Sequence, residues 1–261
     1  MHLVSLGSSF AAGPGLAPIT NTSAKRSSIN YPSLLAKSLG ARHTDLSVSG
    51  ATLLNLSSTR QKVFLGEEFL PQVEGVPEDA DVVTITGGGN DLGYIGKVMM
   101  ANASSITKLL GPVIAWAMGH DLSAPPPDEA EMVRRFQAVY DEIHARAPQA
   151  QILLVGYPAL FGGLADETNT PYTSSQIESF RGIAAVLEKA SVESVRDRPR
   201  VHYVSLAKVS ETHGMESDDP WVSGPEFSLF GGGPAPLHPT ARGMQEIARH
   251  VEEKMKQLGI V

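Results

Sequence analysis

The feature that most constrains the fold is a set of short, mostly apolar segments that recur along the chain. Five of them are found, at residues 2–6, 44–48, 81–86, 151–155 and 201–206, and the second is the weakest. Three run directly into glycine, at Gly7, Gly87 and Gly156. Near-continuous apolar runs of this length are typical of parallel strands covered on both faces. The sequence therefore predicts a buried parallel sheet of five strands.

Between these segments, apolar residues recur at three- and four-residue spacing, which is typical of amphipathic helices. The expected helices cover residues 32–39, 132–145, 176–195 and 240–258. We interpret their apolar positions as core. Strands that alternate with helices predict an α/β fold, here a three-layer α/β/α sandwich with a flavodoxin-like parallel five-stranded sheet and right-handed crossovers.

No internal repeat or low-complexity linker divides the chain, so we expect residues 1–261 to form one domain. Two segments resemble insertions. Residues around 96–127 are apolar and then rich in proline, and residues 162–175 are rich in Thr, Asn and Ser. In open α/β sheets, ligands bind at the carboxyl ends of the strands, where such loops gather.

Charge and composition exclude several classes of partner. The chain has 28 acidic and 21 basic side chains, a net charge of -7, and no long cluster of Lys or Arg, so nucleic acid and anionic membranes are disfavoured. Without cysteine there is no disulfide, thiolate metal site or Cys nucleophile.

Residues 1–7 lack the Lys or Arg of a secretory signal, and the apolar residues 109–118 are too few to span a bilayer. We therefore expect a cytoplasmic protein.

Four short segments at the ends of these elements carry residues suited to chemistry. Ser9 follows the first strand, where a nucleophile can be presented, although serine in a glycine-rich loop is usually a turn residue. Gly50 can offer its N–H to an oxyanion, or can simply end a strand. Asn90 can donate its amide, and the neighbouring Asp91 is better explained as a turn or helix cap. His238, before the last helix, is either a base or a structural residue.

The other seven histidines are scattered and show no metal-ligand spacing. The glycine run at 87–89 lacks the Lys-Ser or Lys-Thr of a phosphate-binding loop. We therefore expect neither a metal nor a cofactor.

Taken in order, the four segments resemble the conserved blocks of the SGNH or GDSL hydrolase family, named for its Ser, Gly, Asn and His. They read Gly-Ser-Ser-Phe-Ala-Ala-Gly at 7–13, Ser-Gly-Ala-Thr at 49–52, Gly-Gly-Asn-Asp at 88–91 and Leu-His-Pro-Thr-Ala-Arg-Gly at 237–243. The resemblance spans nearly the whole chain. It implies the SGNH hydrolase fold and a serine carboxylester hydrolase that works through an acyl-enzyme without metal or cofactor.

The resemblance also implies the roles of individual residues. Ser9 would be the nucleophile and His238 the base, and the oxyanion hole would consist of the Ser9 N–H, the Gly50 N–H and the Asn90 side chain. General base catalysis and three converging donors agree with that reading.

Two positions depart from the family pattern. The Asp that usually precedes the nucleophile is Ser8, and the Asp that usually lies three residues before the histidine is Ala235. Because some family members use a main-chain carbonyl to hold the histidine, we predict a Ser9–His238 dyad oriented by the Ala235 carbonyl. The competing account is a carboxylate from elsewhere, and its candidates are Glu216, Asp218, Asp219 and Glu226.

The substrate is expected to be a small-molecule or lipid ester. The apolar part of residues 96–127 is an acyl pocket, a lid or a buried core helix, and the first two favour hydrophobic esters. One alternative is a carbohydrate O-deacetylase, and another is a binding module that keeps the fold without catalysis. The sequence leaves the acyl length, the alcohol, the pathway and the oligomeric state open.

Overall fold

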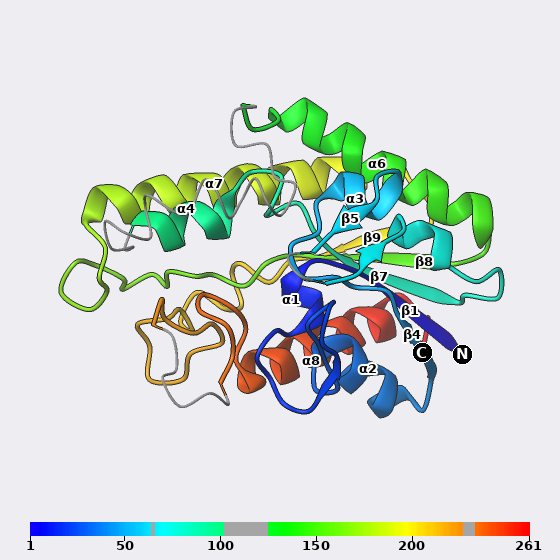
Figure 1. Ribbon diagram of the computed structural model, residues 1–261, viewed down its shortest axis with the longest axis horizontal. Coiled ribbons are helices and arrows are strands. Elements are labelled where there is room, and N and C mark those ends of the chain that lie inside the picture. The colour runs from blue at the N-terminus through cyan, green and yellow to red at the C-terminus, as the bar shows by residue number, and fades with distance from the viewer. Residues whose placement is uncertain (64–65, 102–124, 227–232) are drawn as a thin grey trace.

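The computed structural model describes residues 1–63, 66–101, 125–226 and 233–261. At its centre lies a five-stranded sheet in the order β4-β1-β7-β8-β9, and all neighbouring strands are parallel (Figure 1). The strands are β1 (His2–Gly7), β4 (Arg42–Asp45), β7 (Val82–Thr86), β8 (Gln151–Val155) and β9 (Val201–Val204). This confirms the predicted parallel sheet and its flavodoxin-like strand order.

One strand is displaced from its expected position. Residues 44–48 were expected to be extended, whereas β4 covers Arg42–Asp45. The strand ends there because the Asp45 carboxylate accepts the N–H and the hydroxyl of Ser47, at 2.9 and 2.6 Å, and bends the chain. The chain still follows β1 after the bend, since Val48 N–H donates to the Gly7 carbonyl at 3.0 Å.

Helices cover both faces of the sheet, as the alternating pattern predicted (Figure 1). On one face, α2 (Tyr31–Leu39) packs against α8 (Ala241–Gln257). On the other lie α3 (Leu53–Ser57), α6 (Glu129–Arg146) and α7 (Ser174–Ser194). Each face has its own buried apolar cluster, which confirms the three-layer sandwich.

The long helices begin at capping residues, which explains their boundaries. Asn30, Asp128, Thr173 and Thr240 each accept an N–H from the first turn of the helix that follows. At its other end, α2 stops at Gly40, which adopts a left-handed conformation.

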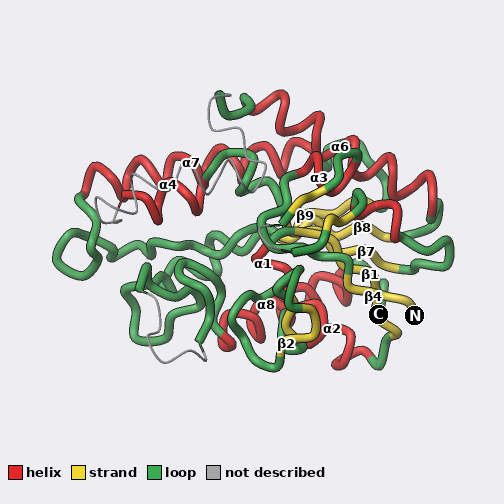
Figure 2. Tube along the Cα trace, in the orientation of Figure 1, coloured by secondary structure: helices red, strands yellow, loops and turns green. Residues whose placement is uncertain are grey.

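The first residues of the expected insertion at 96–127 belong to α4 (Tyr94–Ala101), whose Val98 is fully buried beside α7. Residues 102–124 lie outside the described part, so the choice between lid, acyl pocket and core helix stays a prediction for them. Residues 162–173 form an irregular loop, and Leu164 in it is 85% exposed. Figure 2 shows that loops gather beyond the carboxyl ends of the strands.

Short elements complete the described chain. They are α1 (Ser9–Ala12), the hairpin of β2 (Ile19–Asn21) and β3 (Arg26–Ser27), the hairpin of β5 (Gln61–Lys62) and β6 (Glu68–Phe69), and the 3₁₀ helix η1 (Gln72–Gly75). Among the described helices, none has the length and apolar character needed to cross a bilayer.

Candidate active site

β1 delivers two serines to the carboxyl edge of the sheet. Its last residue, Gly7, has φ +147°, and a Cβ there would collide with the Thr86 carbonyl oxygen, so only glycine fits. Ser8 N–H donates to the same oxygen at 2.9 Å, and Ser9 is the first residue of α1. The chain therefore changes from strand to helix at the serines, which places Ser9 at a helix N-terminus.

A buried glutamine holds this turn from the side. Gly7 N–H donates to Gln72 Oε1 at 2.7 Å, and Gln72 Nε2 donates to the Gly7 carbonyl at 3.0 Å. An amide side chain bonded twice to one residue acts like a neighbouring strand. Gln72 was not predicted, because a lone glutamine 65 residues from Gly7 gives no pattern signal.

The two serines have different surroundings, and the difference favours Ser9 as the nucleophile. Ser8 Oγ lies 3.2 Å from the Tyr157 hydroxyl, which also accepts the Gly89 N–H at 3.3 Å. Through Tyr157, Ser8 therefore connects the segment at 7–13 with the segment at 88–91. Within the described chain, Ser9 Oγ makes no hydrogen bond, so it stays available for chemistry.

The segment around Gly50 leaves a single N–H unpaired. Between residues 47 and 52, the other N–H groups donate to Asp45, Gly7, Ala24, Val48 and Asn55. Gly50 N–H has no acceptor among the described residues, and its φ of +87° suits glycine. Gly50 is partly exposed, so this N–H can donate to water or to a ligand atom.

Asn90 is fixed beside the same segment. Its Nδ2 donates one N–H to the Ala51 carbonyl at 2.9 Å, and its other N–H has no acceptor in the described parts of the chain. Asp91 accepts the Leu53 N–H at the start of α3, at 2.9 Å, and pairs with Arg135 at 3.0 Å. Asp91 lies in a turn, which confirms the first of its two expected roles, and the N-cap of α3 is Thr52. Burial raises the pKa of Asp91, and the hydrogen bonds from the Leu53 N–H and from Arg135 oppose this rise.

His238 corrects one prediction. Its Nδ1 lies 2.7 Å from the carbonyl oxygen of Pro236, not of Ala235. The Ala235 carbonyl instead accepts the His238 main-chain N–H at 3.2 Å and the Ser223 hydroxyl at 2.9 Å. The reason is the tight turn at residues 235–238, in which Leu237 has a left-handed φ of +62°. This turn brings the carbonyl oxygen of Pro236 to the imidazole ring. The acceptor is still a main-chain carbonyl, one residue later than predicted.

This contact fixes the tautomer of the imidazole. A carbonyl oxygen can only accept, so Nδ1 carries the proton and Nε2 presents a lone pair. The ring is 8% exposed, and burial lowers its pKa to about 4, opposed by the Pro236 contact and reinforced by the charge of Lys25. The Phe10 ring lies 5.2 Å from the imidazole, between centroids. No described contact joins Nε2 to Ser9 Oγ, so their pairing stays a prediction.

The competing carboxylates contact other groups. Glu216 accepts the Gly162 N–H, and Asp219 lies near His213 and Arg242, at 3.5 and 3.7 Å. For Asp218 and Glu226 the described residues show no contact with His238. These positions favour the main-chain acceptor.

A different serine does contact a histidine. Ser5 Oγ lies 2.9 Å from His43 Nε2, across β1 and β4. Ser5 is fully buried in mid-strand and its main chain belongs to the sheet ladder, so there is no room for a substrate carbonyl and no free donor. We interpret this pair as a cross-strand contact of the core.

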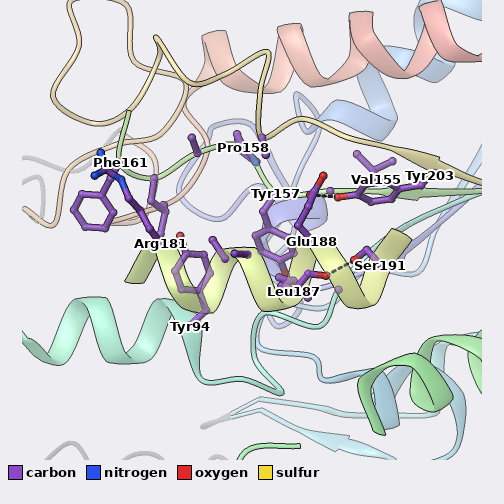
Figure 3. Close-up of a pocket in the computed structure, with 17 residues that line it drawn as sticks. Tyr94, Val155, Tyr157, Pro158, Phe161, Arg181, Leu187, Glu188, Ser191 and Tyr203 are labelled. Carbon is purple, nitrogen blue, oxygen red and sulfur yellow. Dashed lines mark hydrogen bonds between the residues drawn. The ribbon is translucent and has the colours of Figure 1, made fainter. Parts of the chain in front are cut away.

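A cavity of about 320 Å³ lies between α7 and residues 155–161, beside Tyr157 (Figure 3). Its wall is mostly apolar and includes Tyr94 of α4, Phe161 and the α7 residues Ala184 and Leu187. Neither Ser9 nor His238 lines it. Tyr157 is the link, because its ring lines the cavity, packs on Phe10 at 4.5 Å between centroids, and places its hydroxyl against Ser8.

No group of three His, Asp or Glu side chains with metal-binding geometry occurs in the described ranges. The expected lack of a metal or cofactor stays a prediction.

Comparisons with known proteins agree with this arrangement. The sequence model described as GDSL-like lipase/acylhydrolase family matches residues 5–246. "Lipase 2" of Streptomyces coelicolor is 28% identical over 255 residues, which are 96% of this chain and 84% of that protein. The fold resembles an extracellular lipase of Streptomyces rimosus, with TM-score 0.73, 23% identity and coverage of 97% and 99% of the two chains. It also resembles phospholipase A1 of Streptomyces albidoflavus, with TM-score 0.72, 21% identity and coverage of 97% and 98%.

Proposed function

Because the chain belongs to the GDSL-like lipase/acylhydrolase family and is a carboxylic ester hydrolase, we propose that it acts through an acyl-enzyme formed on Ser9. The observation that carries the proposal is the His238 contact with Pro236. It leaves Nε2 as the proton acceptor of a buried, neutral imidazole. Ser9 supplies the hydroxyl, and it is adjacent in the chain to Phe10, whose ring lies 5.2 Å from the imidazole between centroids.

In the proposed reaction, His238 Nε2 removes the Ser9 proton while Ser9 Oγ attacks the ester carbonyl carbon. The carbonyl oxygen becomes an oxyanion and accepts hydrogen bonds from the Ser9 N–H, the Gly50 N–H and the free N–H of Asn90. The imidazolium then gives its proton to the leaving alcohol. A water molecule repeats the sequence on the acyl-enzyme and releases the acid.

Among the described residues, no carboxylate contacts His238. The Pro236 carbonyl orients the ring and keeps the proton on Nδ1, which is the orienting role of the usual aspartate. It carries no full charge, so the imidazolium formed during attack is stabilised less than in a triad. The donors of the oxyanion hole therefore have a larger share in lowering the barrier.

We propose that the substrate is an ester of a hydrophobic acyl chain, and that the cavity beside Tyr157 holds this chain. The apolar wall and the volume of about 320 Å³ support the proposal, and similar proteins are named lipase and phospholipase A1. An acetylated sugar is less well supported, because sugar sites need accessible aromatic rings. Trp221, Tyr31, Tyr140 and Tyr172 are all buried.

The cytoplasmic location expected from the sequence stays a prediction. A similar protein, the lipase of Streptomyces rimosus, is described as extracellular. Fractionation of the native host with an antibody against this chain tests it.

The assignment of the nucleophile is tested with Ser9→Ala and, as the matched control, Ser8→Ala. We expect Ser9→Ala to lose nearly all hydrolysis of p-nitrophenyl butyrate, because the oxyanion hole alone leaves only a small residual rate. Ser8→Ala should keep a substantial part, since it loses only the Tyr157 contact. An alkyl phosphonate ester should label the wild type once, on the peptide that contains Ser9.

Full activity in Ser9→Ala would refute the assignment. If neither ester cleavage nor phosphonate labelling occurs in the folded wild type, the alternative of a catalytically silent binding module replaces the proposal.

A further inference from the structure

Gln61, on β5, reaches the main chain next to Gly50. Its Nε2 donates to the Ser49 carbonyl oxygen at 2.9 Å. The orientation of the side-chain amide follows from the acceptor, because only the NH₂ end can face a carbonyl. Gln61 is buried, and its Oε1 has no partner among the described residues.

The geometry of the peptide unit connects this contact to Gly50. The Ser49 C=O and the Gly50 N–H belong to the same trans peptide, so they lie in one plane and point in opposite directions. A donor that fixes the C=O on one side therefore fixes the direction of the N–H on the other. It also polarises the peptide and makes the N–H a stronger donor.

The remaining contacts of the segment do not hold this peptide. The Ser49 N–H, which donates to the Ala24 carbonyl, belongs to the preceding Val48–Ser49 peptide, and the Ala51 carbonyl, which accepts from Asn90, belongs to the Ala51–Thr52 peptide. Within the described chain, Gln61 is the one group bonded to the Ser49–Gly50 peptide. Glycine at position 50 makes such a restraint more important, because its backbone has more conformational freedom than any other residue.

We propose that Gln61 is a positioning residue of the reaction, which acts through the Ser49–Gly50 peptide to aim and polarise the oxyanion-hole N–H. The proposal rests on the proposed function, in which Gly50 N–H is a donor to the oxyanion. The unpaired Oε1 supports it. A buried amide oxygen without a partner destabilises the fold, so a purely structural position would be better filled by an apolar side chain.

The test uses Gln61→Met, which keeps the length of the side chain and removes the donor. Lys62→Met, on the same strand but exposed, is the matched control. The oxyanion is absent from the bound ester and forms only in the transition state and the tetrahedral intermediate. We therefore expect Gln61→Met to lower kcat about tenfold, less than the loss of a whole donor, and to leave KM within about twofold. The Ki of an alkyl boronic acid, whose adduct carries a negative tetrahedral centre, should rise by a similar factor.

Gln61→Glu gives a second readout that does not depend on the stability of the first variant. The ionised carboxylate cannot donate to the Ser49 carbonyl, but the protonated acid can. We expect kcat of Gln61→Glu to be low at pH 8 and to recover as the pH falls toward 5, whereas the wild type shows no such recovery. Comparison within a single variant removes differences in folding.

Several outcomes overturn the proposal. They are a kcat within twofold of the wild type in folded Gln61→Met, a rise in KM at constant kcat, an unchanged boronic acid Ki, or full activity of Gln61→Glu at pH 8. Ser9→Ala is measured in the same series. Activity in that variant would mean that the proposed function fails, whereas an inactive Ser9→Ala together with a fully active Gln61→Met rejects the role of Gln61 alone.

Discussion

Burial lowers the pKa of His238 to about 4, and this value sets the acidic limit of the proposed reaction. The base works only when Nε2 is unprotonated, so kcat/KM, which reports the free enzyme, should stay level down to about pH 5 and reach half its maximum near pH 4. If the base were a histidine with the ordinary pKa of about 6.5, kcat/KM would instead fall to half its maximum near pH 6.5. The measurement is the pH profile of kcat/KM with a short-chain ester.

Asp219→Asn is the control for this profile, because Asp219 lies near His213 and Arg242 rather than His238. Its profile should match that of the wild type. A midpoint between pH 6 and 7 in the wild type would contradict the buried, neutral base. A loss of several orders of magnitude in Asp219→Asn would show that this carboxylate orients the ring after all.

The side-chain amide of Asn90 is a candidate donor to the oxyanion because only one of its two N–H groups has an acceptor among the described residues. One N–H of its amide is used on Ala51, and the other is free in the described structure. We expect Asn90→Ala to lower kcat by roughly a hundredfold or more, on the order of 3 kcal/mol, with little change in KM, since the contact forms in the transition state. Steady-state kinetics with one ester decide this.

Folding of Asn90→Ala is checked by circular dichroism, because the Ala51 contact is lost as well. If only KM changed, Asn90 would bind the ground state and another donor would be needed.

At the scale of elements, α7 forms one wall of the cavity, and its residues limit the space for the proposed acyl chain. Ala184 lines the cavity, whereas Val192 on the same helix is 48% exposed and does not line it. Ala184→Phe should fill part of the cavity and shift the preference toward short acyl chains without abolishing cleavage of the acetate. Val192→Phe should leave the preference unchanged. The readout is kcat/KM along a series of p-nitrophenyl esters.

An identical chain-length profile for Ala184→Phe and the wild type would place the acyl chain elsewhere. A loss of folded protein would mean that the space is part of the core.

The elements were largely predictable from the sequence, and the site only in part. The spacing of apolar residues located the strands and the long helices, because this spacing is a local signal. Four local blocks likewise gave Ser9, Gly50, Asn90 and His238. The Gln72 and Gln61 contacts join residues 65 and 12 positions apart, and no local pattern records them. The Pro236 acceptor depends on the left-handed conformation of Leu237, and a leucine in the sequence gives no indication of that conformation.

At the scale of the whole molecule, we propose that residues 1–261 fold as one domain. Thermal and urea unfolding should then each show one cooperative transition, with the same midpoint by circular dichroism and by tryptophan fluorescence. Two separate transitions would indicate two units.

The same measurement carries a dependence on pH. The folded pKa of His238, about 4, is lower than its unfolded value near 6.5, so the unfolded state binds more protons between these values. Stability is therefore complete above about pH 6.5 and falls as the pH decreases toward 4. The His238 contribution should lower the free energy of unfolding by about 2 kcal/mol from pH 7 to pH 5, and His238→Gln should show a correspondingly smaller decrease.

The main-chain acceptor of His238 has a consequence for genetics. A catalytic carboxylate is a target that one nucleotide change can remove, whereas the Pro236 carbonyl persists whatever side chain the codon specifies. A saturation screen for inactive but folded variants should therefore recover codons 9 and 238, together with the weaker oxyanion-hole codon 90, but no codon for a carboxylate that orients His238. Milder hits should collect around the turn, at Ser223 and Leu237, whose side chain or conformation shapes the path of the chain. Among descendants of this protein, the orienting function would therefore depend on the conformation of the loop and not on the identity of one side chain.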